Sequence, residues 1–169
     1  MRSSPSLALG FIFTLSVASG QTGAPASAVL ARVEAHAARF GDVSRQIWEF
    51  AEPGFKEAKS AGLLVEELRQ AGFRVREGLA EMPTAFVAEW GSGKPVIGIM
   101  GEFDSLPGLS QETEPVKNPR VAGDYGHGCG HNLLGSGAAL AAVAVKETLD
   151  AAKIPGTIRY YGTPAEEGG

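Results

Sequence analysis

The stretch that decides the fold is LLGSGAALAAVAVKETLDAAKIPGTIRYY, residues 133–161. Residues 133–153 are rich in alanine, leucine and valine, which predicts a largely buried helix. Pro155 and Gly156 end this helix, and the β-branched and aromatic residues of 157–161 predict a strand. A buried helix that leads back into a strand is typical of α/β proteins.

The rest of the chain continues this alternation toward the N-terminus. Apolar residues at three- and four-residue steps predict helices over 29–50 and 56–71, the second capped by Gly72. Strands are predicted over 73–76, 84–90 and 95–100, and the apolar run of the last suits a strand buried on both faces. We therefore expect an α/β fold of three layers, with a mainly parallel sheet and helices on both faces.

The first residues of the chain resemble a targeting segment. Arg2 precedes an apolar stretch over 7–18, and the small residues 18–20 suit cleavage. A membrane anchor is the alternative, but the stretch is shorter than the ~20 residues that span a bilayer. We expect a signal peptide over 1–20, a flexible lead-in over 21–28 and a catalytic-type domain over 29–169, exported to the periplasm or secreted and free of the membrane after cleavage.

Composition limits the classes of partner. The chain has 169 residues, of which 44% are hydrophobic and 20% charged, as in a globular protein with one core. Its formal net charge is -4 and it contains no basic run. This charge argues against nucleic acid as the main partner.

The chain contains one cysteine, Cys129, inside GHGCGHN at 126–132. In an oxidising compartment it has no disulfide partner within the chain, so it is a buried thiol, a link to another chain or a metal ligand. The surrounding glycines and histidines favour the metal. In an extended segment Cys129 and His131 point the same way. A zinc finger needs a second ligand pair at short range, and with no other cysteine in the chain the sequence argues against one.

Two adjacent carboxylates, Glu166 and Glu167, follow the strand at 157–161. The loops 101–104 and 162–169 each follow a strand, and 126–132 precedes a helix that returns to the sheet. All three are therefore expected at one sheet edge, where α/β proteins bind ligands. One carboxylate could bind a metal while the other accepts a proton from water. The alternative is a solvated pair of glutamates in a turn.

Three segments carry a resemblance to a known family. EFDSLPGLSQ at 102–111, GHGCGHNLLG at 126–135 and YGTPAEEGG at 161–169 resemble the di-metal aminoacylase and amidohydrolase peptidases. The resemblance extends over residues 29–169. It implies a metallopeptidase-like catalytic domain and hydrolysis of the amide bond of N-acyl amino acids or dipeptides, including compounds like aminobenzoyl-glutamate.

The resemblance also assigns roles to single residues. Cys129 would be a thiolate that bridges two metals, and His131 and Glu167 would be metal ligands. Glu166 would be the general base, and Asp104 the supporting aspartate beside the metals. The implied cofactors are two divalent ions, either zinc or manganese, with cobalt also compatible with such ligands.

Other features depart from the family pattern. Glu102 stands where classical members have a metal-binding histidine, and His127 is expected at most beside the site. Family members have further histidine ligands and a smaller inserted domain, and no histidine follows His131 here. We therefore expect an incomplete catalytic domain, from a parent that forms a homodimer or hetero-oligomer. The alternatives are an inactive metal-binding fragment and, less well supported, a redox protein that uses Cys129.

Overall fold

The fold comes from a computed structural model that describes residues 26–168. Its elements are the helices α1 (Ala26–Phe50), α2 (Ala58–Gln70) and α3 (His131–Ala152), the strands β1 (Arg74–Glu77), β2 (Phe86–Ser92), β3 (Val96–Glu102) and β4 (Gly156–Thr163), and the short 3-10 helices η1 (Leu79–Glu81) and η2 (Glu166–Gly168).

The expected signal peptide lies outside the described residues. The lead-in predicted over 21–28 is too long, because residues 26–28 already belong to α1. Within residues 26–168, none of the helices has the length and apolar character needed to cross a membrane. The signal peptide and the export that depends on it therefore stay predictions.

The four strands form one sheet in the order β1-β2-β4-β3. The β1–β2 and β2–β4 pairs are antiparallel and only β3–β4 is parallel, so the prediction of a mainly parallel sheet was wrong. The reason lies in the connections. A parallel pair needs a long crossover, which α3 provides between β3 and β4. No α-helix separates β1 from β2, and their short connection through η1 allows only an antiparallel pair.

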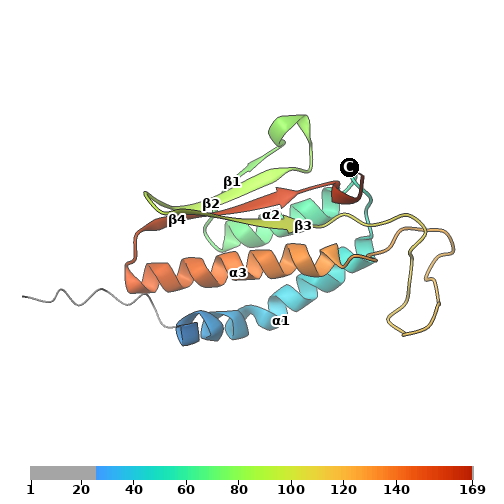
Figure 1. The fold of residues 1–169 in the computed structure, drawn as a ribbon, viewed down its shortest axis with the longest axis horizontal. Coiled ribbons are helices and arrows are strands. Elements are labelled where there is room, and N and C mark those ends of the chain that lie inside the picture. The colour runs from blue at the N-terminus through green and yellow to red at the C-terminus, as the bar shows by residue number, and fades with distance from the viewer. Residues whose placement is uncertain (1–25, 169) are drawn as a thin grey trace, which may run out of the picture.

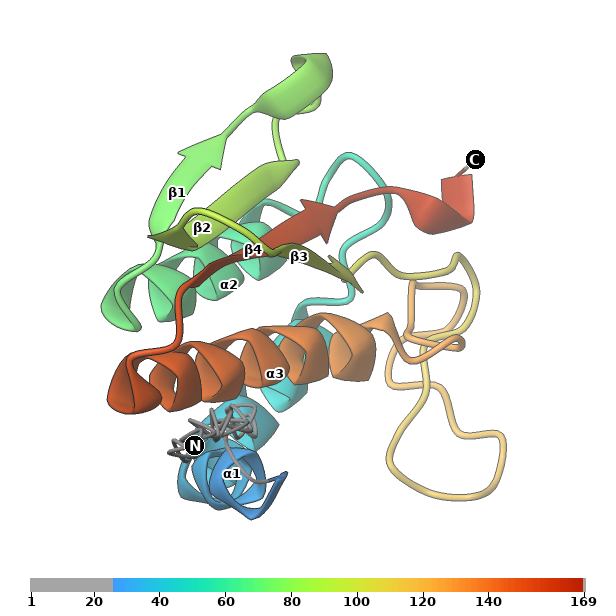
Figure 2. The ribbon, with the colours of Figure 1, turned by 60° about the vertical axis from the view of Figure 1, so that its left-hand side comes forward.

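All three helices lie on the same face of this sheet (Figures 1 and 2). Helices α2 and α3 pack on the strands, and α1 packs mainly against α3. Helices on both faces, as predicted, are therefore not found among residues 26–168. Strand β3 is also not buried on both faces, because it forms one edge of the sheet and exposes Val96, Ile97 and Met100.

The core lies between the sheet and the helices. The Phe86 ring of β2 stacks on Phe103 and Tyr160, with ring centroids 6.0 Å and 5.6 Å apart. Apolar residues from α1, α2 and α3 complete this cluster. Each large apolar side chain buried in it contributes about 1.5–3 kcal/mol to stability. This core holds α3 against the sheet.

The contact between α3 and β3 depends on a missing side chain. A Cβ added at Gly135 would lie 2.6 Å from the backbone oxygen of Glu102, so only glycine allows this approach. The buried Tyr160 hydroxyl donates to the Gly135 backbone oxygen at 3.1 Å. Together these contacts fix the first turns of α3 beside the end of β3.

Candidate metal centre

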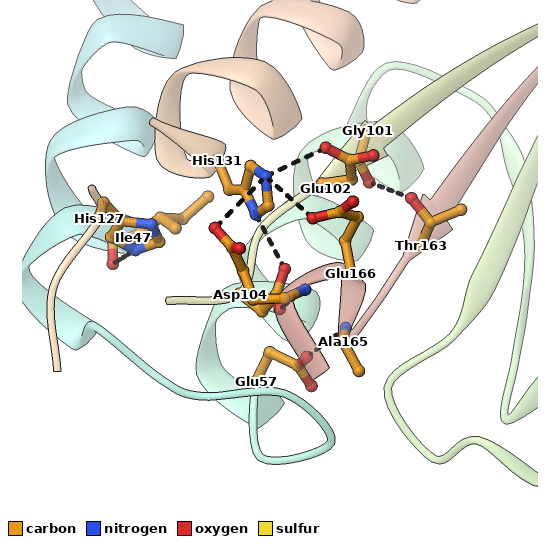
Figure 3. Close-up of polar contacts among 11 residues, drawn as sticks. Ile47, Glu57, Gly101, Glu102, Asp104, His127, His131, Thr163, Ala165 and Glu166 are labelled. Carbon is orange, nitrogen blue, oxygen red and sulfur yellow. Dashed lines mark hydrogen bonds and ion pairs between the residues drawn. The ribbon is translucent and has the colours of Figure 1, made fainter. Parts of the chain in front are cut away.

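The candidate site lies at the carboxyl ends of β3 and β4. Glu102 and Thr163 are partners in the parallel ladder, so the segments that follow them leave the sheet side by side. Helix α3 begins at His131 at the same edge (Figure 3). The convergence predicted for these three loops is confirmed.

His131 is the centre of the site. Its side chain is only 4% exposed, and its Nδ1 atom lies 2.9 Å from Oδ1 of the fully buried Asp104. An aspartate accepts hydrogen bonds, so the Nδ1–H group of His131 donates a hydrogen bond to Asp104. Nε2 is the ring nitrogen that is left to bind a cation, which it can do once it carries no proton. A carboxylate behind a histidine is the usual support of a metal-binding imidazole.

Three further carboxylates surround Nε2 of His131. Glu102 Oε2 lies 3.2 Å away, Glu166 Oε2 3.8 Å and Glu167 Oε1 3.9 Å. The residues fall into two groups that could hold a metal ion, Cys129–His131–Glu167 and Glu102–His131–Glu166. Both groups use His131, and one Nε2 lone pair can bind only one ion.

The backbone around Cys129 differs from the extended conformation that was predicted. Gly130, with a φ of +81°, caps the start of α3, so the chain bends between Cys129 and His131 and is not extended there. The thiol is exposed and free. The neighbouring Glu167 carboxylate raises the pKa of the Cys129 thiol, and loss of hydration is a smaller cause in the same direction. A bound cation has the opposite effect, because it stabilises the thiolate.

The donor atoms suit a metal ion. Within each group one atom per residue lies within 4.8 Å of the others. Metal bonds of about 2.0–2.3 Å put two ligands at most about 4.6 Å apart, so small side-chain movements would close the set. Thiolate, imidazole and carboxylate together suit zinc, manganese or cobalt. For a second ion the described residues leave mainly carboxylates.

The acidic turn is held through its backbone. Asp104 Oδ2 accepts a hydrogen bond from the Glu167 amide at 3.0 Å, so Asp104 supports both His131 and the turn. The Ala165 amide donates to Oε1 of Glu57 at 2.8 Å. Ala165 has a φ of +59°, which is uncommon for a residue with a side chain.

His127 stays outside both groups. Its Nε2 atom lies 3.1 Å from the backbone oxygen of Ile47 in α1. Burial lowers the pKa of His127, so the neutral ring is favoured. Nearby, the Asn132 amide donates to the Ser44 hydroxyl at 3.1 Å. These contacts attach the 126–132 loop to α1.

Two residues that contribute to the site were not assigned to it from the sequence. Glu102, whose role was open, is the carboxylate closest to Nε2 of His131. Glu57 was not a candidate, yet its side chain is fully buried beside the acidic turn. The sequence signal that could have identified Glu102 is its position at the end of a strand, two residues before Asp104. For Glu57 there was no signal, because its partners Thr84 and Ala165 are distant in sequence.

Several known proteins are similar in sequence to this chain. Residues 98–169, which contain every residue of both metal groups, match the model of peptidase family M20/M25/M40. One subunit of the p-aminobenzoyl-glutamate hydrolase of Escherichia coli (strain K12) is 47% identical over 138 residues, covering 81% of this chain and 29% of that protein. Hippurate hydrolase of Campylobacter jejuni is 30% identical over 129 residues, covering 76% of this chain and 32% of that protein. The chain thus spans about a third of the length of these curated relatives.

A solved structure agrees with both the fold and the sequence. The YXEP protein of Bacillus subtilis, described as a dinuclear metal binding peptidase from the M20 family, superposes with a TM-score of 0.63 at 26% identity. The match covers 79% of this chain and 36% of that one. Together with the matched site residues, these likenesses confirm the resemblance to the di-metal peptidases, and residues 98–169 of this chain match peptidase family M20/M25/M40.

Proposed function

We propose that this chain carries part of the active site of a metal-dependent amidohydrolase. The observation that carries the proposal is the buried Asp104–His131 pair, which directs Nε2 toward a thiol and three carboxylates. The relatives named above include hydrolases of p-aminobenzoyl-glutamate and hippurate, both of which are N-acyl amino acids. The substrate we propose is therefore an N-acyl amino acid or a dipeptide.

The residues divide the chemistry between them. Cys129, His131 and Glu167 would hold the first divalent ion, and Glu102 is available to a second. A bound divalent ion supplies Lewis acidity toward water and the amide carbonyl. Glu166, whose side chain is 53% exposed, is free to accept the proton of the attacking water and deliver it to the departing amine. The products are a carboxylic acid and an amine.

Further parts of the proposal rest on the family and on the N-terminal sequence. We infer two divalent ions, zinc or manganese, because the structural relative is described as dinuclear. Export to the periplasm or outside the cell follows from the predicted signal peptide. A homodimer or hetero-oligomer is proposed for the whole enzyme, and nucleic acid is not a proposed partner.

The test is a metal titration followed by an assay. The purified chain is titrated with Zn²⁺, Mn²⁺ and Co²⁺ by calorimetry, and release of amine from p-aminobenzoyl-glutamate and hippurate is then measured with each metal. Metal binding with turnover supports the proposal. Metal binding without turnover supports the alternative, a metal-binding fragment that lacks activity. Absence of binding by the wild type, with retention of the fold, would reject the metal centre itself.

A further inference from the structure

Among residues 26–168, the one fully buried carboxyl group with no role in the proposed chemistry belongs to Glu57. Its side chain has no exposed surface and lies just before α2. A buried charge is costly unless it is hydrogen-bonded. Glu57 meets this condition with two partners, the Thr84 hydroxyl at 2.8 Å on Oε2 and the Ala165 amide at 2.8 Å on Oε1. Both oxygens therefore accept hydrogen bonds.

Glu57 does not serve the helix that it precedes. The first free amides of α2 are satisfied by Glu52, whose carboxylate accepts from the Lys59 amide at 3.1 Å and the Ser60 amide at 2.9 Å. The Glu57 side chain makes no capping bond to α2. The start of the helix still stabilises its negative charge, because helix amides create a positive potential there. Glu57 is thus left free to bind the acidic turn (Figure 3).

Ala165 is the residue of this turn that most needs support. Its φ of +59° lies in the left-handed region, which residues with a side chain adopt at a cost. It is packed closely, since a Cβ added at Gly54 would lie 2.9 Å from the Ala165 Cβ. The next two residues are Glu166 and Glu167, so the conformation of Ala165 determines where both carboxylates point.

We propose that Glu57 is a positioning residue that holds the Ala165 backbone so that Glu166 and Glu167 face His131. Asp104 holds the Glu167 amide from the other side, and the two buried carboxyl groups together fix alternate amides of the turn. The inference rests on the proposed function, because its purpose is to place a metal ligand and a base. Without the Glu57 contact, Ala165 relaxes and Glu167 leaves the metal group.

The test compares two substitutions of nearly equal size. In Glu57→Gln the amide oxygen still accepts from Ala165, while its NH₂ group donates to Thr84. In Glu57→Met the shape is kept and the acceptor is lost. Glu67→Met is the matched control, since Glu67 is a buried residue within α2 that pairs with Arg39 away from the site. Two quantities are measured on the full chain, the hydrogen-exchange rate of the Ala165 amide without metal and the affinity for Co²⁺.

We expect Glu57→Met to speed exchange at Ala165 and to weaken Co²⁺ binding by about 10- to 100-fold, the usual effect of removing a group that supports a metal ligand. Glu57→Gln should keep the Ala165 exchange rate and the Co²⁺ affinity close to those of the wild type. Glu67→Met should change neither quantity. Equal behaviour of the Met and Gln variants would overturn the inference, because it would show that Glu57 only fills space.

The experiment also covers a variant that does not fold and a wild type that binds no Co²⁺. If Glu57→Met does not fold, Thr84→Val takes its place, since it removes one anchor of the Glu57 carboxylate without touching Ala165. Unchanged exchange and unchanged Co²⁺ affinity in that variant would then reject the positioning role. If the wild type itself binds no Co²⁺, the proposed function fails, while exchange at Ala165 still tests the Glu57 contact independently.

Discussion

Nδ1 of His131 lies 2.9 Å from Oδ1 of Asp104, and Oδ2 of the same aspartate accepts the backbone amide of Glu167 at 3.0 Å. One buried carboxylate thus orients one proposed metal ligand and holds the backbone of another. The same contact selects the tautomer of His131 whose Nε2 faces the carboxylates. Asp104 therefore influences the site without needing to touch a metal.

Asp104→Asn should lower the affinity for Zn²⁺ by about 10- to 100-fold, because the asparagine amide cannot support both contacts with the charge of a carboxylate. Calorimetric titration measures this effect. Asp150→Asn, an exposed position near the end of α3, is the control and should leave the affinity unchanged. An Asp104→Asn variant that binds Zn²⁺ as well as the wild type contradicts the supporting role.

Glu166→Gln and Glu167→Gln should have different effects if their roles differ. Loss of the proposed base should reduce turnover by about 10²- to 10⁴-fold while metal content stays near that of the wild type. Loss of the proposed ligand should reduce metal content first. Metal analysis beside the amine-release assay separates the two. The assignment is wrong if Glu166→Gln also loses the metal or keeps normal turnover.

Alkylation of Cys129 should depend on pH in a particular direction. The Glu167 carboxylate raises the pKa of the thiol, so less thiolate is present at a given pH than in an ordinary cysteine. The rate of reaction with iodoacetamide in metal-free protein should therefore have its midpoint at a higher pH than that of an ordinary cysteine thiol. In Glu167→Gln the midpoint should fall, and added Zn²⁺ should protect the thiol. A wild-type midpoint at or below the ordinary value would contradict the arrangement.

Two glycines of α3 provide a matched test of the packing under the site. Gly135→Ala places a methyl group 2.6 Å from the Glu102 backbone oxygen and should lower the free energy of unfolding by about 1–3 kcal/mol. Gly137 has open space around it, so Gly137→Ala should raise stability by up to about 1 kcal/mol through helix propensity. Denaturant unfolding measures both. Equal effects at the two positions would show that α3 does not approach β3 this closely.

Local sequence signals located most elements correctly. The alanine-rich run 133–153 corresponds to α3. Gly72, which was predicted as the cap of α2, follows the cap residue Ala71 and has the positive φ, +88°, that is typical of a helix end. The direction of the strands could not be obtained in this way, because alternation of helices and strands does not reveal that β2 pairs with β4 in antiparallel register. The neighbours of a strand depend on the whole chain.

In the site, too, some residues could be identified from local sequence and others only from the folded structure. Cys129, His131 and Glu167 could be singled out because their side chains are those of metal ligands and lie in glycine-rich loops. The convergence of their loops followed from a general property of α/β sheets. Glu57 could not be found, because its role arises from hydrogen bonds to residues 27 and 108 positions away. Contacts of this range are visible only in the folded chain.

The edge position of β3 has a practical consequence for handling this protein. Within the part of the chain that the structure describes, the outer side of β3 has no partner strand, and Val96, Ile97 and Met100 are exposed there. Such an edge can recruit a strand from another molecule, and this is a common start of aggregation. Concentrated solutions of the isolated chain should therefore self-associate, and lysine at position 97 or 100 would be the simplest way to improve its solubility.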